Sequence, residues 1–327
     1  METKKIRNKF SMNQNVSTIL FLMLFILLFS VILTFATPNF LNSYNIGIII
    51  KQMSFFGIAA LGQTLVLIIA GIDLSIGSTA CLGGIFFALC MTTLGMNPVL
   101  AVILCTAIGC GIGYLNGLLI TKLRLHPFIV TLAVSNIGYG FVLVITEGYT
   151  ISGITGDVLA MGQGMLGAIP VPTLIFIAAV AVLAYILKFT PFGRELFAIG
   201  GNHAAARLVG VKVEARKRNV YLISGGLSAF AGIMVACRYN SGQPTIGETW
   251  VMSSITAAVI GGTSMDGGVG TVVGTLVGAL LMQLLSNSIV MLNVSQYWEA
   301  VMTGGVVLLA VAIDALRTMH RNKQLSK

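Results

Sequence analysis

Long stretches without a charged side chain constrain this sequence more than any other feature. There are 41 uncharged residues between Lys9 and Lys51, and 48 between Asp73 and Lys122. A helix that crosses the hydrocarbon core of a bilayer needs about 20 mostly apolar residues. These two stretches are therefore long enough to hold one and two membrane-spanning helices, respectively.

The overall composition agrees with a chain that has lipid as its main solvent. Hydrophobic residues make up 56% of the chain and charged residues only 9%, whereas soluble proteins carry about 25% charged residues. The net charge of +9 does not indicate nucleic-acid binding, because the basic residues lie in four short patches between apolar runs. That distribution is typical of a membrane protein.

Charges, Gly and Pro divide the chain into about ten expected spans, so the predicted fold is an all-α polytopic membrane protein. Residues 1–327 are expected to form a single transmembrane domain in which some helices are short or broken. Glycine rows at Gly109/Gly113/Gly117 and Gly270/Gly274/Gly278 predict close helix packing. The spans are expected near 17–37, 52–72, 74–94, 98–121, 125–146, 171–189, 219–237, 251–262, 271–291 and 297–316.

The distribution of basic residues predicts the orientation of the chain. With ten spans, residues 1–16, 122–126, 188–218 and the C-terminal tail share one side and carry 17 of the 19 Lys and Arg residues. Only Lys51, expected in the link between the first two spans, and Arg238 fall on the other side. Cytoplasmic segments carry the basic excess. The tails 1–16 and 317–327 and the loop 190–218 are therefore expected in the cytoplasm, with the chain in the plasma (inner) membrane.

Catalytic and metal-binding patterns are absent from the sequence. It contains no HExxH, GxSxG or GxxxxGK[ST] motif, and its five cysteines show no CxxC spacing. Enzymatic activity, a metal site and a P-loop are therefore not expected. No ion-relay residue is predicted inside a span. The chain is thus either a passive channel or facilitator, or a transporter that another subunit powers.

The loop 190–218 contains the strongest local helix signals outside the spans. Asn202 is suited to cap a helix over Ala204–Leu208 through its side-chain oxygen, and Gly210 is suited to end that helix. A short helix with small side chains, placed between glycines, suits docking into a groove on a partner. The spacing alone leaves an ordinary connector equally open.

Two similar polar segments interrupt apolar runs. Ile69-Ala70-Gly71 precedes Asp73-Leu74-Ser75-Ile76-Gly77, and Ile260-Gly261-Gly262 precedes Asp266-Gly267-Gly268-Val269-Gly270. Transporters often contain repeated elements with broken helices near the transport pathway. Asp73 is expected either to cap a helix that begins near Leu74 or to contact the pathway as a gate.

Several segments, in order, resemble ABC permeases of the ribose/galactoside class. Phe192 to Val211 is similar to the cytoplasmic coupling pattern FGR-x-x-x-A-I-G-G-N-x-x-A-A-R-x-x-G-I, with Val211 in place of Ile. Ala70 to Ser78 is similar to GGIDLSVGS, with Ala70 in place of Gly. Asn116-Gly117, His126 to Leu132, Ala258 to Ser264 and Gly267 to Thr271 also match. The resemblance covers nearly the whole chain.

This resemblance implies a binding-protein-dependent ABC importer permease. It implies a second permease chain, identical or different, and an ABC ATPase that carries ATP and Mg, with no cofactor on this chain. It also implies an extracytoplasmic solute-binding protein. The implied solute is a pentose, a hexose or a related furanosyl compound. A nucleoside or a branched-chain amino acid remains the alternative, beside the passive channel.

The resemblance also assigns two groups of candidate residues. The first group would couple the chain to the ATPase: Arg194, Gly200, Gly201, Asn202, Ala204, Ala205, Arg207 and Gly210. The second group would line or gate the pathway: Asp73, Ser75, Asn116, Gly261, Gly262 and Thr263.

Overall fold

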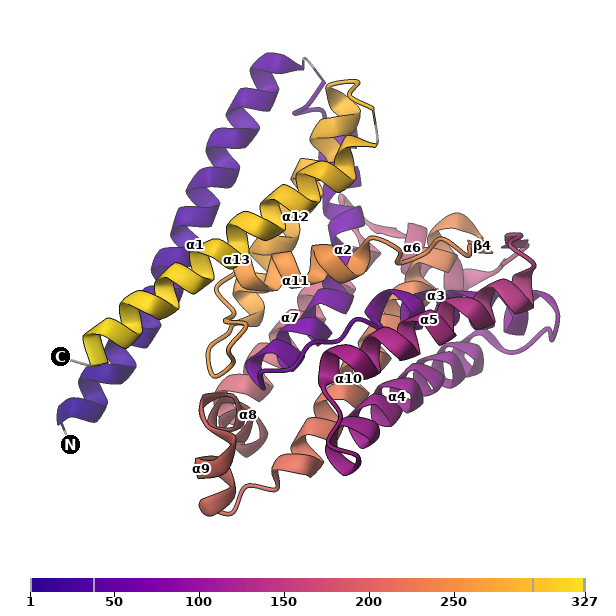
Figure 1. Cartoon of the computed structure of the whole chain (residues 1–327). Helices are drawn as coiled ribbons and strands as arrows, with labels where there is room; N and C mark the ends of the chain where they lie inside the picture. Colours follow the sequence, from indigo (N-terminus) through magenta and orange to yellow (C-terminus); the bar gives the residue numbers. More distant parts are fainter. Residues whose placement is uncertain (1, 38, 296, 326–327) are drawn as a thin grey trace.

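The protein is a bundle of long helices with almost no sheet. In the computed structural model, the backbone is described for residues 2–37, 39–295 and 297–325. Side chains are described for residues 17–37, 39–295, 297–309 and 311–312. Within these ranges, the architecture agrees with the predicted all-α polytopic membrane protein (Figure 1).

Seven of the described helices are long and apolar enough to cross a membrane. They are α1 (Glu2–Ala36, apolar from Ser17), α2 (Ser43–Ile68), α4 (Pro98–Lys122), α5 (Pro127–Thr146), α7 (Val171–Phe189), α10 (Val213–Tyr239) and α12 (Val272–Met291). Three more helices are apolar over shorter lengths: α3 (Ile76–Thr92), α11 (Trp250–Ile260) and α13 (Trp298–Leu325). These helices correspond one by one to the ten predicted spans.

The remaining elements are short. They are α6 (Ala160–Gln163), α8 (Pro191–Gly201), α9 (His203–Leu208) and the 3-10 turn η1 (Asp157–Leu159). Two antiparallel pairs of two-residue strands join β1 (Ile151–Ser152) to β4 (Ser241–Gly242) and β2 (Met165–Leu166) to β3 (Ile169–Pro170). The β1–β4 pair ties the loop after α5 to the loop after α10.

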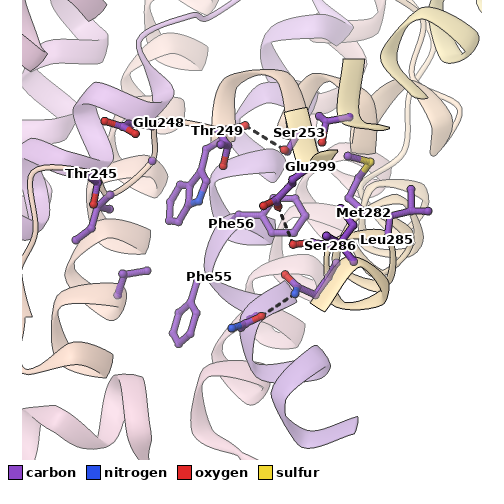
Figure 2. Close-up of a pocket in the computed structure, with 18 of the residues that line it drawn as sticks. Phe55, Phe56, Thr245, Glu248, Thr249, Ser253, Met282, Leu285, Ser286 and Glu299 are labelled. Atoms are coloured by element: carbon purple, nitrogen blue, oxygen red, sulfur yellow. Dashed lines mark hydrogen bonds between the residues drawn. The ribbon is translucent and has the colours of Figure 1, made fainter. Parts of the chain in front are cut away.

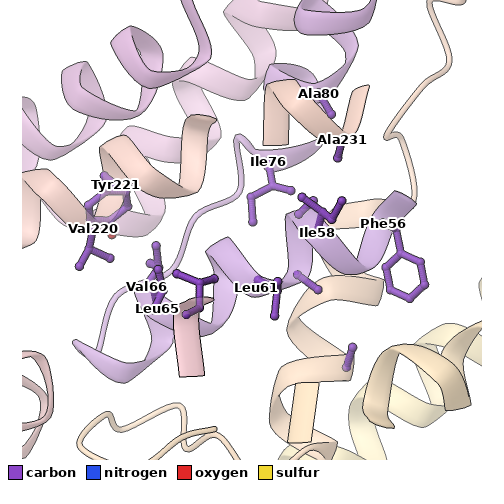
Figure 3. Close-up of a cluster of buried hydrophobic side chains, with 14 of the residues drawn as sticks. Phe56, Ile58, Leu61, Leu65, Val66, Ile76, Ala80, Val220, Tyr221 and Ala231 are labelled. Carbon is purple, nitrogen blue, oxygen red and sulfur yellow. The ribbon is translucent and has the colours of Figure 1, made fainter. Parts of the chain in front are cut away.

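Helix α2 forms the centre of the bundle and is buried on all sides from Met53 to Ile68. It contacts α10, α7, α11 and α12. Figure 3 shows its apolar side chains, such as Leu61 and Leu65, beside Ile76 of α3 and Val220 of α10. Since charged groups are costly at this depth, the buried part of the central helix carries no charged side chain.

The glycine rows act as predicted, by letting helix backbones approach closely. A Cβ at Gly113 of α4 would collide with the carbonyl group of Tyr221 on α10. A Cβ at Gly278 of α12 would likewise collide with the carbonyl group of Ala257 on α11. The prediction of close helix packing at these rows is confirmed.

The bundle has two ends that differ in the elements they carry. Helices α2 and α7 end, and α10 begins, beside α8 and α9; this is the α8–α9 end. Helix α2 begins and helices α10 and α12 end at the opposite end, here called the pocket end. Figure 1 places the start of α1 and the end of α13 toward the α8–α9 end.

One predicted boundary is wrong. Lys51 lies inside α2 rather than in a link, and its Nζ donates to the carbonyl oxygen of Gln163 at 3.3 Å. Helices α1 and α13 extend into the expected tails, since α1 begins at Glu2 and α13 continues to Leu325, and the apolar part of α1 begins at Ser17, as predicted. The predicted loop 190–218 contains α8, α9 and the first turns of α10. Charges near a bilayer surface therefore do not mark helix ends.

Candidate functional site

Helix α9 has the local structure that the sequence predicts. The side-chain oxygen of Asn202 accepts from the backbone N–H of Ala205 at 3.0 Å, so Asn202 caps the helix. The helix runs from His203 to Leu208, and Gly210 follows with φ +86°. A positive φ favours Gly, which explains the helix stop at this position.

Sequence reasoning missed helix α8, although a signal for it exists. Thr190 caps α8 by accepting from the N–H of Gly193 at 3.3 Å, and Pro191 occupies the first helical position. A capping Thr followed by Pro is typical of a helix start. The predicted loop is therefore a pair of short helices joined at Asn202.

The two short helices have an exposed surface, and ion pairs attach them to α10. Of the eight predicted coupling residues, only Gly200 is buried; the other seven are exposed. Leu208 and Val209 are 88% and 78% exposed. Ion pairs join Glu195 of α8 to Arg216 and Arg207 of α9 to Glu214, both on α10. These ion pairs hold the two short helices against the start of α10 and leave the predicted coupling residues accessible on the surface.

The buried end of α8 rests on the links that follow α2 and α11. A Cβ at Gly200 would collide with the carbonyl oxygen of Ile68 and with the backbone nitrogen of Gly268. These two atoms are joined by a hydrogen bond of 2.9 Å, from Gly268 N–H to Ile68 O. We call Gly200, Ile68 and Gly268 the glycine joint. It brings the coupling segment and the two similar polar segments of the sequence together at one point.

Ala70, where the sequence departs from the family pattern, lies beside this joint. Its φ of +56° belongs to the left-handed region, which Gly adopts without strain. A Cβ at Gly267 would in turn collide with Ala70. The backbone conformation at this position therefore favours the glycine of the family pattern, and Ala70 adopts it only under strain.

Asp73 lies at the centre of a buried hydrogen-bond network just beyond the end of α2. It is 1% exposed. One carboxylate oxygen accepts from the N–H of Ser75 at 2.9 Å and from its hydroxyl at 2.6 Å, and the other accepts from the Ser224 hydroxyl at 2.9 Å. The Asn116 amide donates to the Ser75 hydroxyl at 2.8 Å. The network ties the α2–α3 link to α4 and α10.

The predicted capping role of Asp73 needs correction. Helix α3 begins at Ile76 with Ser75 at its N-cap position, rather than near Leu74. Asp73 therefore orders the turn before the helix. No cationic side chain forms an ion pair with Asp73 among the residues described. Since an isolated buried carboxylate is costly, the three donors that surround it are what make this position tolerable.

The remaining pathway candidates lie in the α11–α12 link. Gly261 packs against Gly274 of α12, and Gly262 has φ +95°. Thr263 is buried, and its hydroxyl has no hydrogen-bond partner in the described part of the chain. A Cβ at Gly270 would touch both Thr263 and Ile68. The structure thus places both groups of pathway candidates around the end of α2.

A cavity of about 390 Å³ lies at the pocket end and contains none of the pathway candidates (Figure 2). Amides, hydroxyls, aromatic rings and three charged groups line it. Its residues come from α2, α10, α11, α12, α13 and the loop before α11; they include Gln52, Phe56, Arg238, Gln243, Glu248, Trp250, Ser253, Gln283, Ser286 and Glu299. The sequence offers no signal for the cavity, because the residues that line it are dispersed from residue 52 to residue 303.

Comparison with protein families gives a match over most of the chain. Residues 45–311 match the family described as branched-chain amino acid transport system / permease component. The ribose import permease protein of Bacillus subtilis (strain 168) is 42% identical over 296 residues, which cover 90% of this chain and 91% of that protein.

Other relatives are similar over comparable lengths. The ribose import permease protein of Escherichia coli (strain K12) is 38% identical, over 85% of this chain and 88% of that protein. The galactose/methyl galactoside import permease protein of Haemophilus influenzae (strain ATCC 51907 / DSM 11121 / KW20 / Rd) is 34% identical, over 86% and 89%. No solved structure matches the chain. Because both the family and the relatives match over most of the chain, the chain belongs to the family of multi-pass permease components of ABC import systems that its motifs resemble.

Proposed function

We propose that this chain is the membrane-spanning subunit of an ATP-driven importer for a monosaccharide, with ribose or a similar pentose or hexose as its solute. Several relatives that match over most of their length are import permeases for ribose or galactosides. The partners of Asp73 in the buried network are neutral polar groups, and only three of the side chains that line the cavity are charged, which suits a neutral solute.

The observation that carries this proposal is the close packing of α8, at Gly200, against Ile68 and Gly268 of the glycine joint. A partner that binds the exposed side of α9 and shifts α8 would push directly on the links after α2 and α11. Since packed interfaces switch between discrete arrangements, such a push moves the bundle rather than deforming it locally. The partner is an ABC ATPase, which carries ATP and Mg.

The orientation that we propose is the one that the distribution of basic residues and a cytoplasmic ATPase both favour. The α8–α9 end faces the cytoplasm together with both termini, and the pocket end faces outward. A solute-binding protein docks at the pocket end and delivers the sugar there. A second permease chain completes the transporter, whether identical to this one or different.

The experiment that tests this function is uptake by the complex reconstituted in vesicles. Labelled D-ribose, D-xylose, D-galactose and D-allose are supplied with the binding protein, with and without the ATPase and ATP. We expect uptake of at least one sugar only when ATP and the ATPase are present. Uptake by this chain alone, or uptake of leucine or a nucleoside in place of a sugar, would contradict the proposal.

A variant on α9 tests the docking surface itself. Ala205→Trp adds a large side chain to an exposed position beside the Asn202 cap, where a close-packed contact tolerates overpacking poorly. We expect normal membrane insertion, loss of solute-stimulated ATP hydrolysis and loss of uptake. Ala205→Ser, which adds a single oxygen atom, is the matched control and should transport normally. Normal coupling in Ala205→Trp would place the docking surface elsewhere.

A further inference from the structure

The outer face of α5 carries an amide in the middle of a membrane-spanning helix. Asn136 lies halfway along α5, between Pro127 and Thr146, and its side chain is exposed. Because each residue of a helix adds 1.5 Å, the amide lies about 14 Å from either end of α5. That depth is close to the centre of the hydrocarbon core, where polar groups are costly.

Other exposed faces of the bundle are apolar at the same depth. The exposed residues in the middle of α7 are Ile177, Ala178, Ala181 and Val182, and those in the middle of α1 are Leu24, Phe25, Leu27 and Leu28. Such faces suit contact with lipid tails. Among the described residues of the seven long apolar helices, Asn136 is the only exposed Asn or Gln outside the first and last two turns of its helix.

Small residues lie beside Asn136 on the same face. Ala133 is one turn before it and Gly140 one turn after it, and both are exposed. A Cβ at Gly140 would meet no atom within 4 Å, so packing inside this chain does not require a glycine there. We call Ala133, Asn136 and Gly140 the Asn136 face. Its small side chains leave the amide accessible from outside the bundle.

The opposite, buried face of α5 rests on the segment that leads from the glycine joint to Asp73. The Thr131 hydroxyl lies 3.4 Å from the carbonyl oxygen of Ile72 and donates to it. A Cβ at Gly138 would meet the side chain of Ser78 at the start of α3. Helix α5 therefore packs directly over the turn that Asp73 orders, and it lies on the side of the bundle away from α1 (Figure 1).

An exposed amide at mid-membrane indicates contact with something other than lipid. Polar side chains at this depth face a protein interior or a water-filled cavity, and they mark substrate pathways. A solute that crosses between two permease chains contacts surfaces that are exposed in each single chain. The Asn136 face is such a surface, and α5 carries no charged side chain that would favour an ionic solute.

We propose that the Asn136 face lines the sugar pathway between this chain and the second permease chain, and that the Asn136 amide donates and accepts hydrogen bonds to the hydroxyls of the sugar at mid-membrane. The inference rests on the proposed function, since it names a residue that the imported sugar meets. The amide has two N–H donors and a carbonyl oxygen, which match a neutral polyhydroxylated solute. A shift of the glycine joint reaches this face through the contact between Ile72 and Thr131.

Cysteine labelling tests whether the face meets water or lipid. The five cysteines of the chain are first replaced, and the complex of two permease chains and the ATPase is reconstituted in vesicles. Asn136→Cys is then treated from both sides with a charged methanethiosulfonate. We expect reaction at least about tenfold faster than that of Val182→Cys, because only a hydrated thiol ionises to the reactive thiolate.

Val182 is the matched control for this labelling. It lies in the middle of α7 and is 57% exposed, on an apolar face. An Asn136→Cys thiol that reacts as slowly as the Val182→Cys thiol, with and without ATP, would overturn the proposal. Equally fast reaction at both positions would also overturn it, because exposure to the reagent would then not distinguish the Asn136 face from the lipid-facing surface.

The contact with the sugar is tested by Asn136→Leu. We expect kcat for sugar uptake to fall about tenfold, the equivalent of one hydrogen bond to the solute. Asn136→Gln keeps the amide and should restore most of the uptake. The melting temperature and the association of the two permease chains should not change, because the exposed side chain leaves no gap in this chain when it is replaced. Val182→Leu, which places the same side chain on α7, should transport as the wild type.

Three outcomes would overturn the role of Asn136. They are normal uptake by Asn136→Leu, an equal fall in Val182→Leu, and dissociation of the two permease chains in Asn136→Leu. The last outcome would show that the amide packs directly against the second chain and not against the sugar. Failure of the wild-type complex to import any sugar would instead contradict the proposed function, so the two failures are distinguishable.

Discussion

Gly200 and its neighbour Gly201 offer a matched test of how α8 is connected to the bundle. A Cβ at Gly200 would collide with two backbone atoms, Ile68 O and Gly268 N, whereas a Cβ at Gly201 would meet no atom within 4 Å. Backbone atoms cannot rotate away as a side chain can. In Gly200→Ala, either α8 moves off the joint or the hydrogen bond between Ile68 and Gly268 breaks.

The expected cost follows from these two contacts. Overpacking by one methyl group costs about 1–3 kcal/mol, and the lost backbone hydrogen bond costs about 1 kcal/mol. Alanine in a helix regains up to about 1 kcal/mol relative to glycine. The net destabilisation of Gly200→Ala is therefore about 1–3 kcal/mol. Gly201→Ala should be neutral or slightly stabilising, because it adds no contact.

Two measurements on the assembled complex test this reasoning. Thermal unfolding of each variant reports the stability, and ATP hydrolysis with solute-loaded binding protein reports the coupling. We expect Gly200→Ala to unfold at a lower temperature and to lose the stimulation of hydrolysis by solute, while Gly201→Ala keeps the melting temperature of the wild type. Equal melting temperatures of the two variants would refute the close packing of α8 against the glycine joint.

Three further predictions concern the network, the orientation and the pH dependence. Ser224→Ala removes the one donor that the described residues supply to the second oxygen of Asp73, and it should destabilise the protein by about 1–3 kcal/mol in thermal unfolding; an unchanged melting temperature would contradict the network. Single cysteines at Thr155 and Asn202, in a cysteine-free background, should be labelled from opposite sides of the membrane, and labelling from the same side would contradict the ten-span arrangement. The hydrogen bond that Arg216 of α10 donates to Glu195 lowers the pKa of the Glu195 carboxyl group. The ion pair therefore stabilises α8 fully above the unfolded-state pKa of Glu195, and this stabilisation is lost as the pH falls through the lowered folded-state pKa. Hydrogen exchange of α8 should accelerate below about pH 4.3 in the wild type, but Glu195→Gln should not show this acceleration.

The predictions that succeeded depend on interactions between residues close in the sequence. The Asn202 cap, the extent of α9 and the stop at Gly210 involve groups within eight residues of one another. The spans follow from the length of apolar runs, which is also a local property. The errors occur where a local rule has an exception, as with Lys51. Its side chain reaches a carbonyl group at the bundle edge, so its charge does not end the helix.

The candidate site was predictable only in part. The motifs identified Asp73, Ser75 and Asn116 as pathway candidates, and the structure joins all three in one network. Their role in transport stays a prediction. Ser224, which completes the network from α10, carries no signal in the sequence, because it lies 151 residues from Asp73.

The sequence by itself determined that this chain spans a membrane, that it has about ten helices, and that a capped helix interrupts the long basic segment. Each of these features depends on solvent preference or on hydrogen bonds between near neighbours. Only the tertiary structure decided that Gly200 meets the end of α2 and the α11–α12 link, and that the buried Gln63 amide has no hydrogen-bond partner among the described residues. Those features depend on which helices pack together and how each is rotated about its axis. That rotation is set by the sum of many close contacts between distant segments, which no single stretch of sequence contains.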